Sequence, residues 1–242
     1  MYFKTAGPQR MRIQAREDGV SIDQVVLSAA LYLTAAPGAA KNDTTILSET
    51  AATPPPAGYT VLYAAEAPIK AGAWKVTPDP TAAGGSRIEH PDAGAAKLTA
   101  PLANPVNYFE MTFQADAGRP YHLWTRGRAA GNSWANDSVF VQFDGSTTAA
   151  GAAINRIGTT TAAIVTLEDC INCGVSGWGW QDNGFGAGVM GDPLYFAKSG
   201  TQRIRIQTRE DGFSIDQIVL SPSTYLSSSP GRLKDDTTIL SK

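Results

Sequence analysis

The sequence lacks a basic excess and a long apolar run, and it has little histidine. Its 242 residues carry 20 Lys and Arg against 22 Asp and Glu, so we expect no nucleic-acid partner. No apolar run approaches the roughly 18 residues of a transmembrane helix, so we expect no membrane insertion. The two histidines, His90 and His122, are not near a nucleophile motif, and no carboxylate pair is placed as in a glycosidase. We therefore expect no enzymatic activity.

Cysteine is also scarce, with only Cys170 and Cys173. The glycine-rich sequence that follows them cannot form the helix of a redox motif, and zinc would need two more soft ligands close by. We predict a local disulfide, with a free thiol pair as the alternative. A disulfide indicates an oxidising compartment, extracellular or at the cell surface. The first residues, MYFKTAGPQRM, have no apolar signal core, so we interpret the chain as part of a longer protein whose export signal lies upstream.

An internal repeat organises the chain. Residues 2–48 recur as residues 195–241 without gaps, and 30 of these 47 aligned positions are identical. We therefore divide the chain into three parts. They are the C-terminal hairpin and tail of a preceding repeat (1–48), a proline-rich linker (49–58) and a complete repeat (59–242).

Alternating and β-branched segments predict strands along most of the chain. RIRIQTR (203–209) alternates apolar and polar side chains, EDG predicts a turn, and SIDQIVLS (214–221) predicts a second strand. We expect these two strands to form a hairpin. Similar segments recur between the two copies, and none keeps a helical period. The sequence therefore predicts an all-β fold, an antiparallel β-sandwich of the jelly-roll, galactose-binding-like type.

Tryptophans beside polar residues indicate a surface that binds sugars. A sugar ring stacks its apolar face on a flat aromatic side chain, and its hydroxyls need Asn, Asp, Gln or Arg partners. The predicted carbohydrate-binding residues are Trp178, Trp180, Trp134, Trp124, Asn132, Asn136, Asp137, Asp182, Asn183 and Arg126. The alternative is that the rings of the loop tryptophans fill the ends of the sandwich.

The strand YHLWTRGRA predicts one unusual face. Alternation places His122, Trp124, Arg126 and Arg128 together on the side opposite the core. This face is either the wall of a binding cleft or a ring stacked under guanidinium groups.

Three segments together resemble the family 6 and family 35 carbohydrate-binding modules. They are the opening LYAAEA with GAWKV, the middle RPYHLWTRGRAAGNSWANDSVFVQFDG, and the closing GTQRIRIQTREDGFSIDQIVLS. The resemblance implies a calcium-binding jelly roll attached to a bacterial glycoside hydrolase, with a polysaccharide as its ligand.

Asp216 has an unusual position in the last strand. Strict alternation puts it on the same face as Ile218 and Leu220, and a carboxylate facing a core is costly unless it is paired or bound to a cation. The resemblance implies that Glu66 and Asp216 together hold a structural Ca²⁺ ion, which prefers oxygen ligands. The alternative is an ion pair between Asp216 and an arginine such as Arg209.

The sequence thus predicts a non-catalytic carbohydrate-binding module of a secreted or cell-surface bacterial protein. Its expected partners are a polysaccharide and neighbouring copies of the same repeat. The alternative is a structural repeat of an extracellular fibre, sheath or adhesin, assembled by head-to-tail exchange of the hairpin in residues 2–48.

Overall fold

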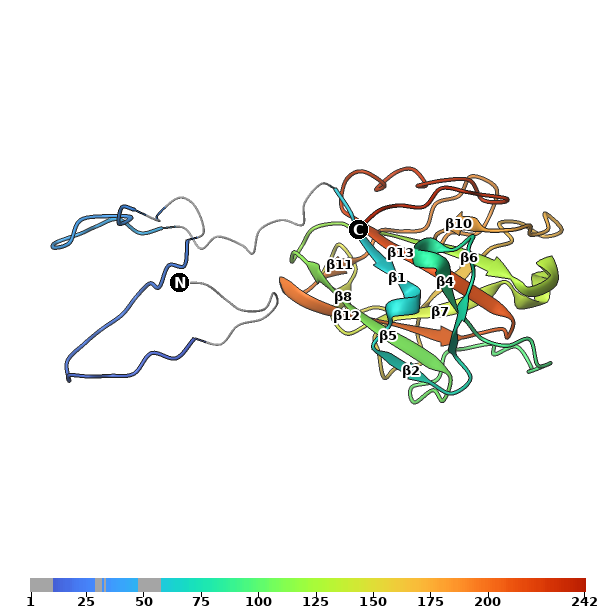
Figure 1. The fold of residues 1–242 in the computed structure, drawn as a ribbon, viewed down its shortest axis with the longest axis horizontal. Coiled ribbons are helices and arrows are strands. Elements are labelled where there is room, and N and C mark those ends of the chain that lie inside the picture. The colour runs from blue at the N-terminus through green and yellow to red at the C-terminus, as the bar shows by residue number, and fades with distance from the viewer. Residues whose placement is uncertain (1–10, 29–31, 33, 48–57) are drawn as a thin grey trace. The chain divides into compact units, whose positions relative to one another are not determined.

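The computed structural model describes residues 11–28, 32, 34–47 and 58–242 (Figure 1). The chain forms two compact units, Met1–Thr50 and Ala51–Lys242. The predicted linker, residues 49–58, lies outside the described residues except for Gly58. Among the residues described, no helix is long and apolar enough to cross a membrane.

The second unit is built of short strands and single turns of 3-10 helix. The strands are β1 (Thr60–Tyr63), β2 (Ile69–Ala71), β3 (Lys75–Pro78), β4 (Ser86–Glu89), β5 (Tyr108–Ala115), β6 (His122–Ala129), β7 (Ser138–Phe143), β8 (Ser146–Thr147), β9 (Ala163–Thr166), β10 (Gly179–Gln181), β11 (Tyr195–Phe196), β12 (Gly200–Thr208) and β13 (Phe213–Ser221). The 3-10 turns are η1 (Ala64–Glu66), η2 (Ala83–Gly85), η3 (Ala130–Asn132) and η4 (Trp134–Asn136).

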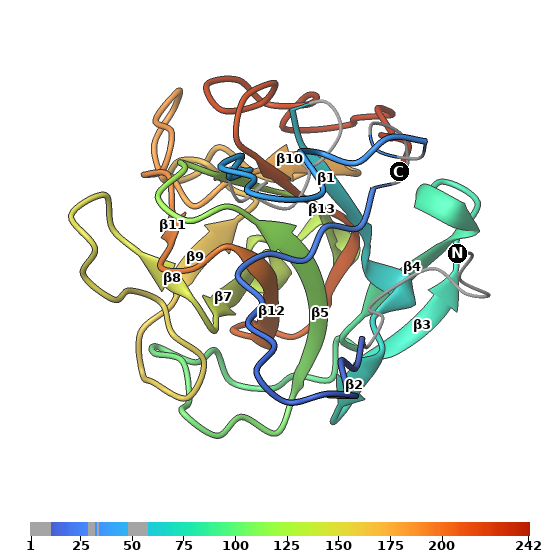
Figure 2. The same cartoon turned by 90° about the vertical axis from the view of Figure 1, so that its left-hand side faces the viewer.

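These strands form two main sheets that enclose one apolar core. The first sheet has the order β10-β6-β13-β4-β3, with β1 also paired to β13, and the second has the order β2-β5-β12-β7-β9. Figure 2 shows β12 between β5 and β7 in the second sheet. The strand pairs within both sheets are antiparallel. The predicted antiparallel β-sandwich is therefore confirmed.

The core follows from alternation along the strands. Ile204 and Ile206 of β12 are buried between the sheets, as the period of two predicts. Phe113 of β5 packs edge-to-face on Phe196, with ring centroids 5.4 Å apart. Full burial of one such side chain stabilises the fold by about 1.5–3 kcal/mol, so the alternating apolar positions account for the way the sheets pack.

The predicted hairpin between residues 203–209 and 214–221 is wrong. β12 pairs with β5 and β7, whereas β13 pairs with β1, β4 and β6. The turn between them includes Gly212, whose φ is +74°, and it carries the chain from one sheet to the other. Because both strands have neighbours on either side, they complete the middle of both sheets.

Asp216 does not lie on the predicted face, because β13 is irregular at this point. The register between β13 and β6 shifts between Ile215 and Gln217, as in a β-bulge. Ile215 and Ile218 consequently both belong to the core. Asp216 instead contacts Arg126 of β6.

A C-terminal tail, residues 222–242, covers part of the outer face of the first sheet. Its Leu240 packs with Trp124 and Trp180 in a small apolar cluster separate from the main core. The backbone N–H of Trp180 donates to the carbonyl of Arg232 at 2.9 Å. The tail is the dark red segment that runs past β10 in Figure 1. This cover decides which of the predicted site residues can reach a ligand.

Candidate functional site

Trp178 is held under two arginines. Its ring centroid lies 4.9 Å from the guanidinium carbon of Arg126 and 4.8 Å from that of Arg128. The indole Nε1 donates to Thr81 Oγ1 at 2.9 Å, and the side chain is 5% exposed. Its predicted role as an exposed stacking surface is wrong, because the arginines already cover the ring.

Trp180 and Trp124 are also buried, under the C-terminal tail. Trp180 is 1% exposed, and its Nε1 donates to the carbonyl of Thr238 at 3.3 Å. The indole of Trp124 donates to the carbonyl of Tyr225 at 2.7 Å. Trp180 is buried, but not as the predicted alternative has it: its ring packs with Trp124 and Leu240 in a cluster separate from the main core, rather than at an end of the sandwich. The sequence did not reveal the cover, because the tail forms no strand.

Asp182 is a buried anchor of the glycine-rich loop. One of its oxygens lies 2.7 Å from His122 Nε2, and it accepts hydrogen bonds from the backbone N–H groups of Gly184 and Gly191. Burial raises the pKa of Asp182, but the contacts with His122 and the two amides outweigh it and lower the pKa. The charge therefore fixes the loop from inside and is not presented to a ligand.

Two predicted amides hold loops in place. Asn132 is exposed, has a φ of +51° and accepts a hydrogen bond from the N–H of Gly177 at 3.0 Å. Asn136 is buried and donates to a carboxylate oxygen of Asp92 at 3.0 Å. Both have a structural partner on another segment of the chain.

The predicted calcium ligands have other partners. Glu66 is paired with Lys242, and Asp216 with Arg126 and the N–H of Ala83. Burial raises the pKa of Asp216 to about 6 although Arg126 opposes the shift. Ca²⁺ needs six to eight oxygen ligands, and the guanidinium group already occupies the cation position beside Asp216. These residues do not fit a calcium ion, and the arginine ion pair is the alternative that fits, with Arg126 in place of Arg209.

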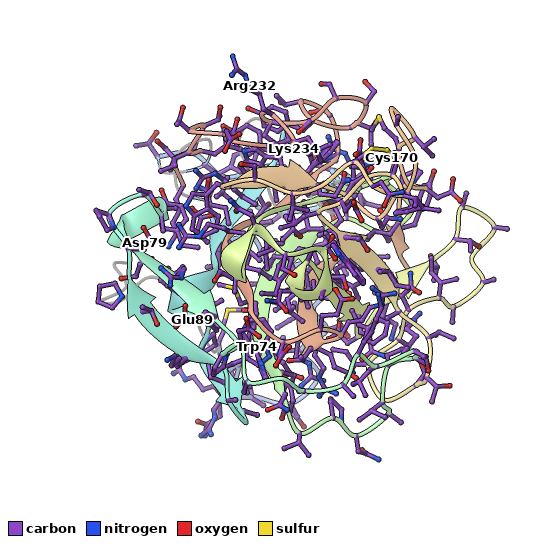
Figure 3. All side chains as sticks on the ribbon, turned by 90° about the vertical axis from the view of Figure 1, so that its right-hand side faces the viewer. Trp74, Asp79, Glu89, Cys170, Arg232 and Lys234 are labelled. Carbon is purple, nitrogen blue, oxygen red and sulfur yellow. A yellow bond between two sulfur atoms is a disulfide. The ribbon has the colours of Figure 1, made fainter. Side chains whose placement is uncertain are left out.

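The predicted disulfide between Cys170 and Cys173 is present. Together with Asp169, the two sulfurs form a compact group of potential metal ligands, but sulfurs joined to each other offer no thiolate to a metal. Lys234 of the tail donates to the carbonyl of Cys173 at 2.6 Å, and Figure 3 shows Lys234 on the same side of the unit as Cys170. The disulfide loop and the tail therefore support each other.

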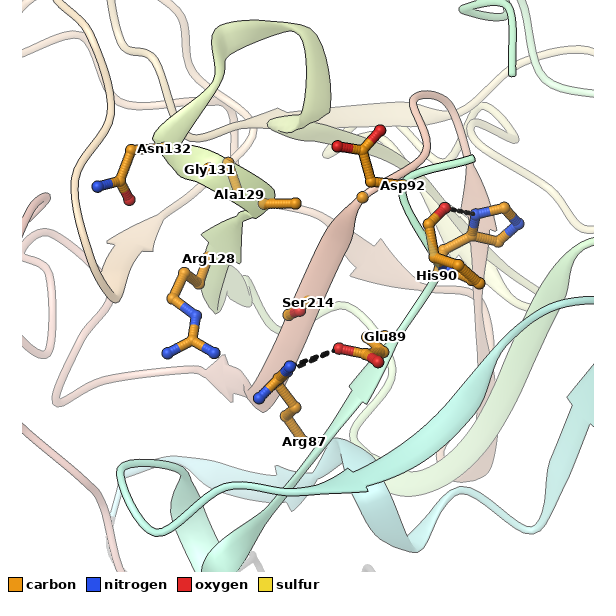
Figure 4. Close-up of a pocket in the computed structure, with 12 residues that line it drawn as sticks. Arg87, Glu89, His90, Asp92, Arg128, Ala129, Gly131, Asn132 and Ser214 are labelled. Atoms are coloured by element: carbon orange, nitrogen blue, oxygen red, sulfur yellow. Dashed lines mark hydrogen bonds and ion pairs between the residues drawn. The ribbon is translucent and has the colours of Figure 1, made fainter. Parts of the chain in front are cut away.

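One hollow of about 670 Å³ is lined mainly by charged and polar residues (Figure 4). Arg87 and Glu89 lie side by side on β4, point toward each other and pair at 2.6 Å. Asp79, directly after β3, pairs with both Arg87 and Arg128, at 2.6 and 2.8 Å. None of the residues that line the hollow is Trp, Tyr or Phe. These charges mainly satisfy one another, and the hollow offers no stacking surface for a sugar ring.

A second hollow, of about 630 Å³, is lined by two exposed aromatic rings, and we call it the aromatic hollow. Trp134 of η4 is 65% exposed, and Phe185 of the glycine-rich loop is 56% exposed. The other lining residues are Lys97, Asp137, Asn155, Ala162, Ala163, Ile164, Thr166, Glu168, Asn183, Gly184 and Arg209. The structure therefore brings together three predicted site residues, Trp134, Asp137 and Asn183.

A buried carboxyl pair lies at this hollow. The backbone N–H of Asp137 donates to Glu210 Oε2 at 3.2 Å, and Lys97 Nζ lies 2.5 Å from Glu210 Oε1. Burial and the neighbouring Glu210 raise the pKa of Asp137 to about 7. Burial also raises the pKa of Glu210, but Lys97 and Ser138 lower it by more. At neutral pH Glu210 is therefore ionised, and Asp137 carries a proton in about half of the molecules.

Sequence reasoning missed three residues of this region. Phe185 lies three residues after Asp182, in the same glycine-rich segment as Trp178 and Trp180. The sequence does offer one signal for Phe185: neighbouring glycines have no side chains that could cover an aromatic ring, which favours its exposure. Lys97 and Glu210 lie 113 positions apart, and no local pattern connects them.

No known protein-family model matches the chain, and a search of curated proteins gave no match. Among solved structures, the chain is similar to three of interest. A β-(1,4)-mannanase with a family 35 module from Podospora anserina has 15% identity and a TM-score of 0.42, over 69% of this chain and 28% of that one. The family 6 module of a laminarinase from Zobellia galactanivorans has 11% identity and a TM-score of 0.39, over 67% and 98%. A family 35 module from Clostridium thermocellum has 12% identity and a TM-score of 0.34, over 67% and 98%.

Proposed function

We propose that the second unit is a non-catalytic carbohydrate-binding module and that the aromatic hollow is its binding site. The observation that carries this proposal is that Trp134 and Phe185 are both more than half exposed and line one hollow. Exposed rings that share a concave surface can stack on the apolar faces of sugar residues.

Polar groups around the rings support the same ligand class. The amide of Asn183 and the carboxylate of Glu168 line the hollow and are partly exposed. They can accept or donate hydrogen bonds to sugar hydroxyls. Lys97 lines the hollow too, but its ammonium group is engaged with Glu210. The hollow is open to water, so we expect modest affinity, micromolar or weaker.

The carboxyl pair fits a structural role better than a catalytic one. In a glycosidase, two carboxyl groups stand roughly 5 Å or more apart on either side of the scissile bond. Asp137 and Glu210 are instead hydrogen-bonded to each other and buried. They hold the start of β7 against the turn after β12 and leave no room for a substrate between them.

The disulfide supports an extracellular or cell-surface location for this module. Disulfides persist in oxidising compartments, and Cys170–Cys173 closes a loop that contacts the tail. We propose a polysaccharide as the partner there and leave its identity to experiment.

A glycan array of plant, algal and microbial polysaccharides tests the proposal. The chain should bind a restricted set, and the Trp134→Ala/Phe185→Ala variant should lose that binding. Replacement of Ile171, which is 80% exposed but does not line the hollow, is the control and should retain it. If the wild-type chain binds nothing, or if the double variant binds as well as the wild type, the proposal fails.

A second candidate function is that of a structural repeat in an extracellular fibre, sheath or adhesin. The specific observation in its favour is the identity of 30 residues between segments 2–48 and 195–241. Light scattering distinguishes the two functions, because a fibre-forming repeat associates into larger species as concentration rises and a simple binding module stays monomeric.

A further inference from the structure

Two segments of the chain share local geometry as well as sequence. We call residues 204–240, which include most of β12, β13 and the tail, the closing segment, and residues 11–47 its N-terminal copy. In the closing segment, the side-chain amide of Gln217 donates to and accepts from the backbone of Leu240 at 2.7 and 3.0 Å. In the copy, Gln24 and Leu47 make the same two hydrogen bonds at 2.7 and 3.1 Å.

The turns of the two segments also correspond. Gly212, in the turn that leads from β12 to β13, has a φ of +74°, and Gly19 in the copy has a φ of +71°. Asp235 in the tail has a φ of +49°, and Asn42 has a φ of +53°. The N-terminal copy therefore takes the backbone course of the closing segment at both left-handed positions.

The apolar side chains of the two segments differ sharply in burial. Ile206 and Ile218 of the closing segment are at most 1% exposed, whereas their counterparts Ile13 and Val25 are 56% and 50% exposed. Ile46 is exposed in the copy, as is its counterpart Ile239 in the closing segment. The other exposed large apolar residues in the described part of the copy are Met11, Ile13, Val20, Ile22, Val25, Val26 and Leu27. Their counterparts are all buried: Ile204, Ile206, Phe213, Ile215, Ile218, Val219 and Leu220. The copy thus presents the side chains of a sandwich core without a core around them.

The polar contacts of the closing segment are also retained in the sequence of the copy. Asp211 accepts hydrogen bonds from the N–H groups of Ala93 and Ala95 at 2.8 and 2.7 Å, and Asp18 is its counterpart. Asp216 pairs with Arg126, and its counterpart is Asp23.

In two further contacts, the residue of the closing segment that binds the body is again identical in the copy. Arg205 pairs with Glu110 of β5 at 2.6 Å, and its counterpart is Arg12. Glu210 bonds the backbone of Asp137, and Glu17 corresponds to it. These four charged side chains are therefore unchanged in the copy, whereas Asp235, which accepts a hydrogen bond from Ser176, is replaced by Asn42.

We propose that the N-terminal copy is a second closing segment, whose partner is a sandwich body with the sequence of residues 58–199 that lacks its own closing segment. In such a body the neighbours of β12 in one sheet and of β13 in the other are left without a partner strand. The copy offers complementary apolar side chains, the same four charged side chains and a matching turn. A body completed in this way buries the seven apolar side chains, and both sheets regain their middle strand.

Full-length variants test this complementarity. Ile206→Asp/Ile218→Asp places two carboxylates in the core and should expel the closing segment. We expect this chain to keep a cooperative thermal transition and its near-ultraviolet circular dichroism, because the N-terminal copy takes the vacant position. Its melting temperature should be lower than that of the wild type, since Val20 replaces Phe213, which packs beside Gly127.

Two control chains make the test decisive. Ile13→Asp/Val25→Asp alone should unfold like the wild type, because both positions are exposed. All four substitutions together should abolish the cooperative transition. The proposal is overturned if Ile206→Asp/Ile218→Asp lacks a cooperative transition, or if the fourfold variant retains one.

Discussion

Both polar atoms of the Gln217 side-chain amide form hydrogen bonds with the backbone of Leu240. Its Nε2 donates to the Leu240 carbonyl at 2.7 Å, and its Oε1 accepts from the Leu240 N–H at 3.0 Å. Gln217 is buried completely, so these two bonds attach the end of the tail to the middle of the first sheet. The tail in turn covers Trp124 and Trp180.

Gln217→Ala should lower the free energy of unfolding by about 1–3 kcal/mol, since it removes the buried hydrogen-bond partner of Leu240. Urea unfolding measures the change. Gln24→Ala is a matched control, because Gln24 makes the same pair of bonds at an exposed position. Its effect should stay within about 0.5 kcal/mol. Equal losses in the two variants would contradict the role assigned to the tail.

Arg126 and Asp216 form a buried ion pair between β6 and β13. Arg126→Ala should cost about 3–5 kcal/mol, because it leaves a buried carboxylate without its partner. The double variant Arg126→Met/Asp216→Leu removes both charges and should recover much of that loss. Chemical denaturation of the wild type, Arg126→Ala and the double variant measures the free energy of unfolding of each and shows whether the double variant lies between the other two. A double variant less stable than Arg126→Ala would show that the pair itself is strongly stabilising.

Calcium should not stabilise the chain through Glu66 and Asp216, because Lys242 and Arg126 already neutralise them. The melting temperature should be the same in excess chelator and in millimolar Ca²⁺. An ion bound to the native state at a hundred times its dissociation constant would stabilise by about 2.7 kcal/mol. A clear rise in melting temperature with Ca²⁺, lost in Asp216→Asn, would restore the calcium site.

The raised pKa of Asp137 predicts how stability depends on pH. Burial raises it from 3.8 in the unfolded chain to about 7 in the folded chain, so the folded state binds more protons between these values. Stability should therefore fall as pH rises from about 4 to about 7. Asp137→Asn removes this titration, and its urea midpoint should fall less steeply than that of the wild type across the same window. If the urea midpoints of the wild type and Asp137→Asn change with pH in parallel, the pKa of Asp137 is not raised by folding.

The strands could be predicted from the sequence because their signal is local. Ile204 and Ile206 alternate with Arg203 and Arg205, and burial follows this alternation. The pairing of the strands could not be predicted in the same way. A short turn before Phe213 suits either a hairpin or a crossing between sheets, and the choice depends on which distant strands supply partners.

The position of single site residues depends on features outside their own segments. Asp216 leaves the predicted face because of one irregular position in β13. Trp178 and Trp180 are buried by arginines and by a tail that forms no strand. Trp134 stays exposed, and Phe185, 51 residues away in sequence, lines the same hollow. Only the folded chain brings these two rings together.

The fluorescence of Trp134 tests the proposed carbohydrate site most directly. Four of the five tryptophans are at most 5% exposed, and Trp134 is 65% exposed, so a water-soluble quencher such as acrylamide acts mainly on Trp134. A polysaccharide identified on the array should reduce this quenching in proportion to binding. Phe185→Ala should weaken the apparent affinity by roughly two- to tenfold, in line with a stacking contribution of about 0.5–1.5 kcal/mol. Binding that leaves the quenching of Trp134 unchanged would contradict the assignment of the aromatic hollow as the carbohydrate site.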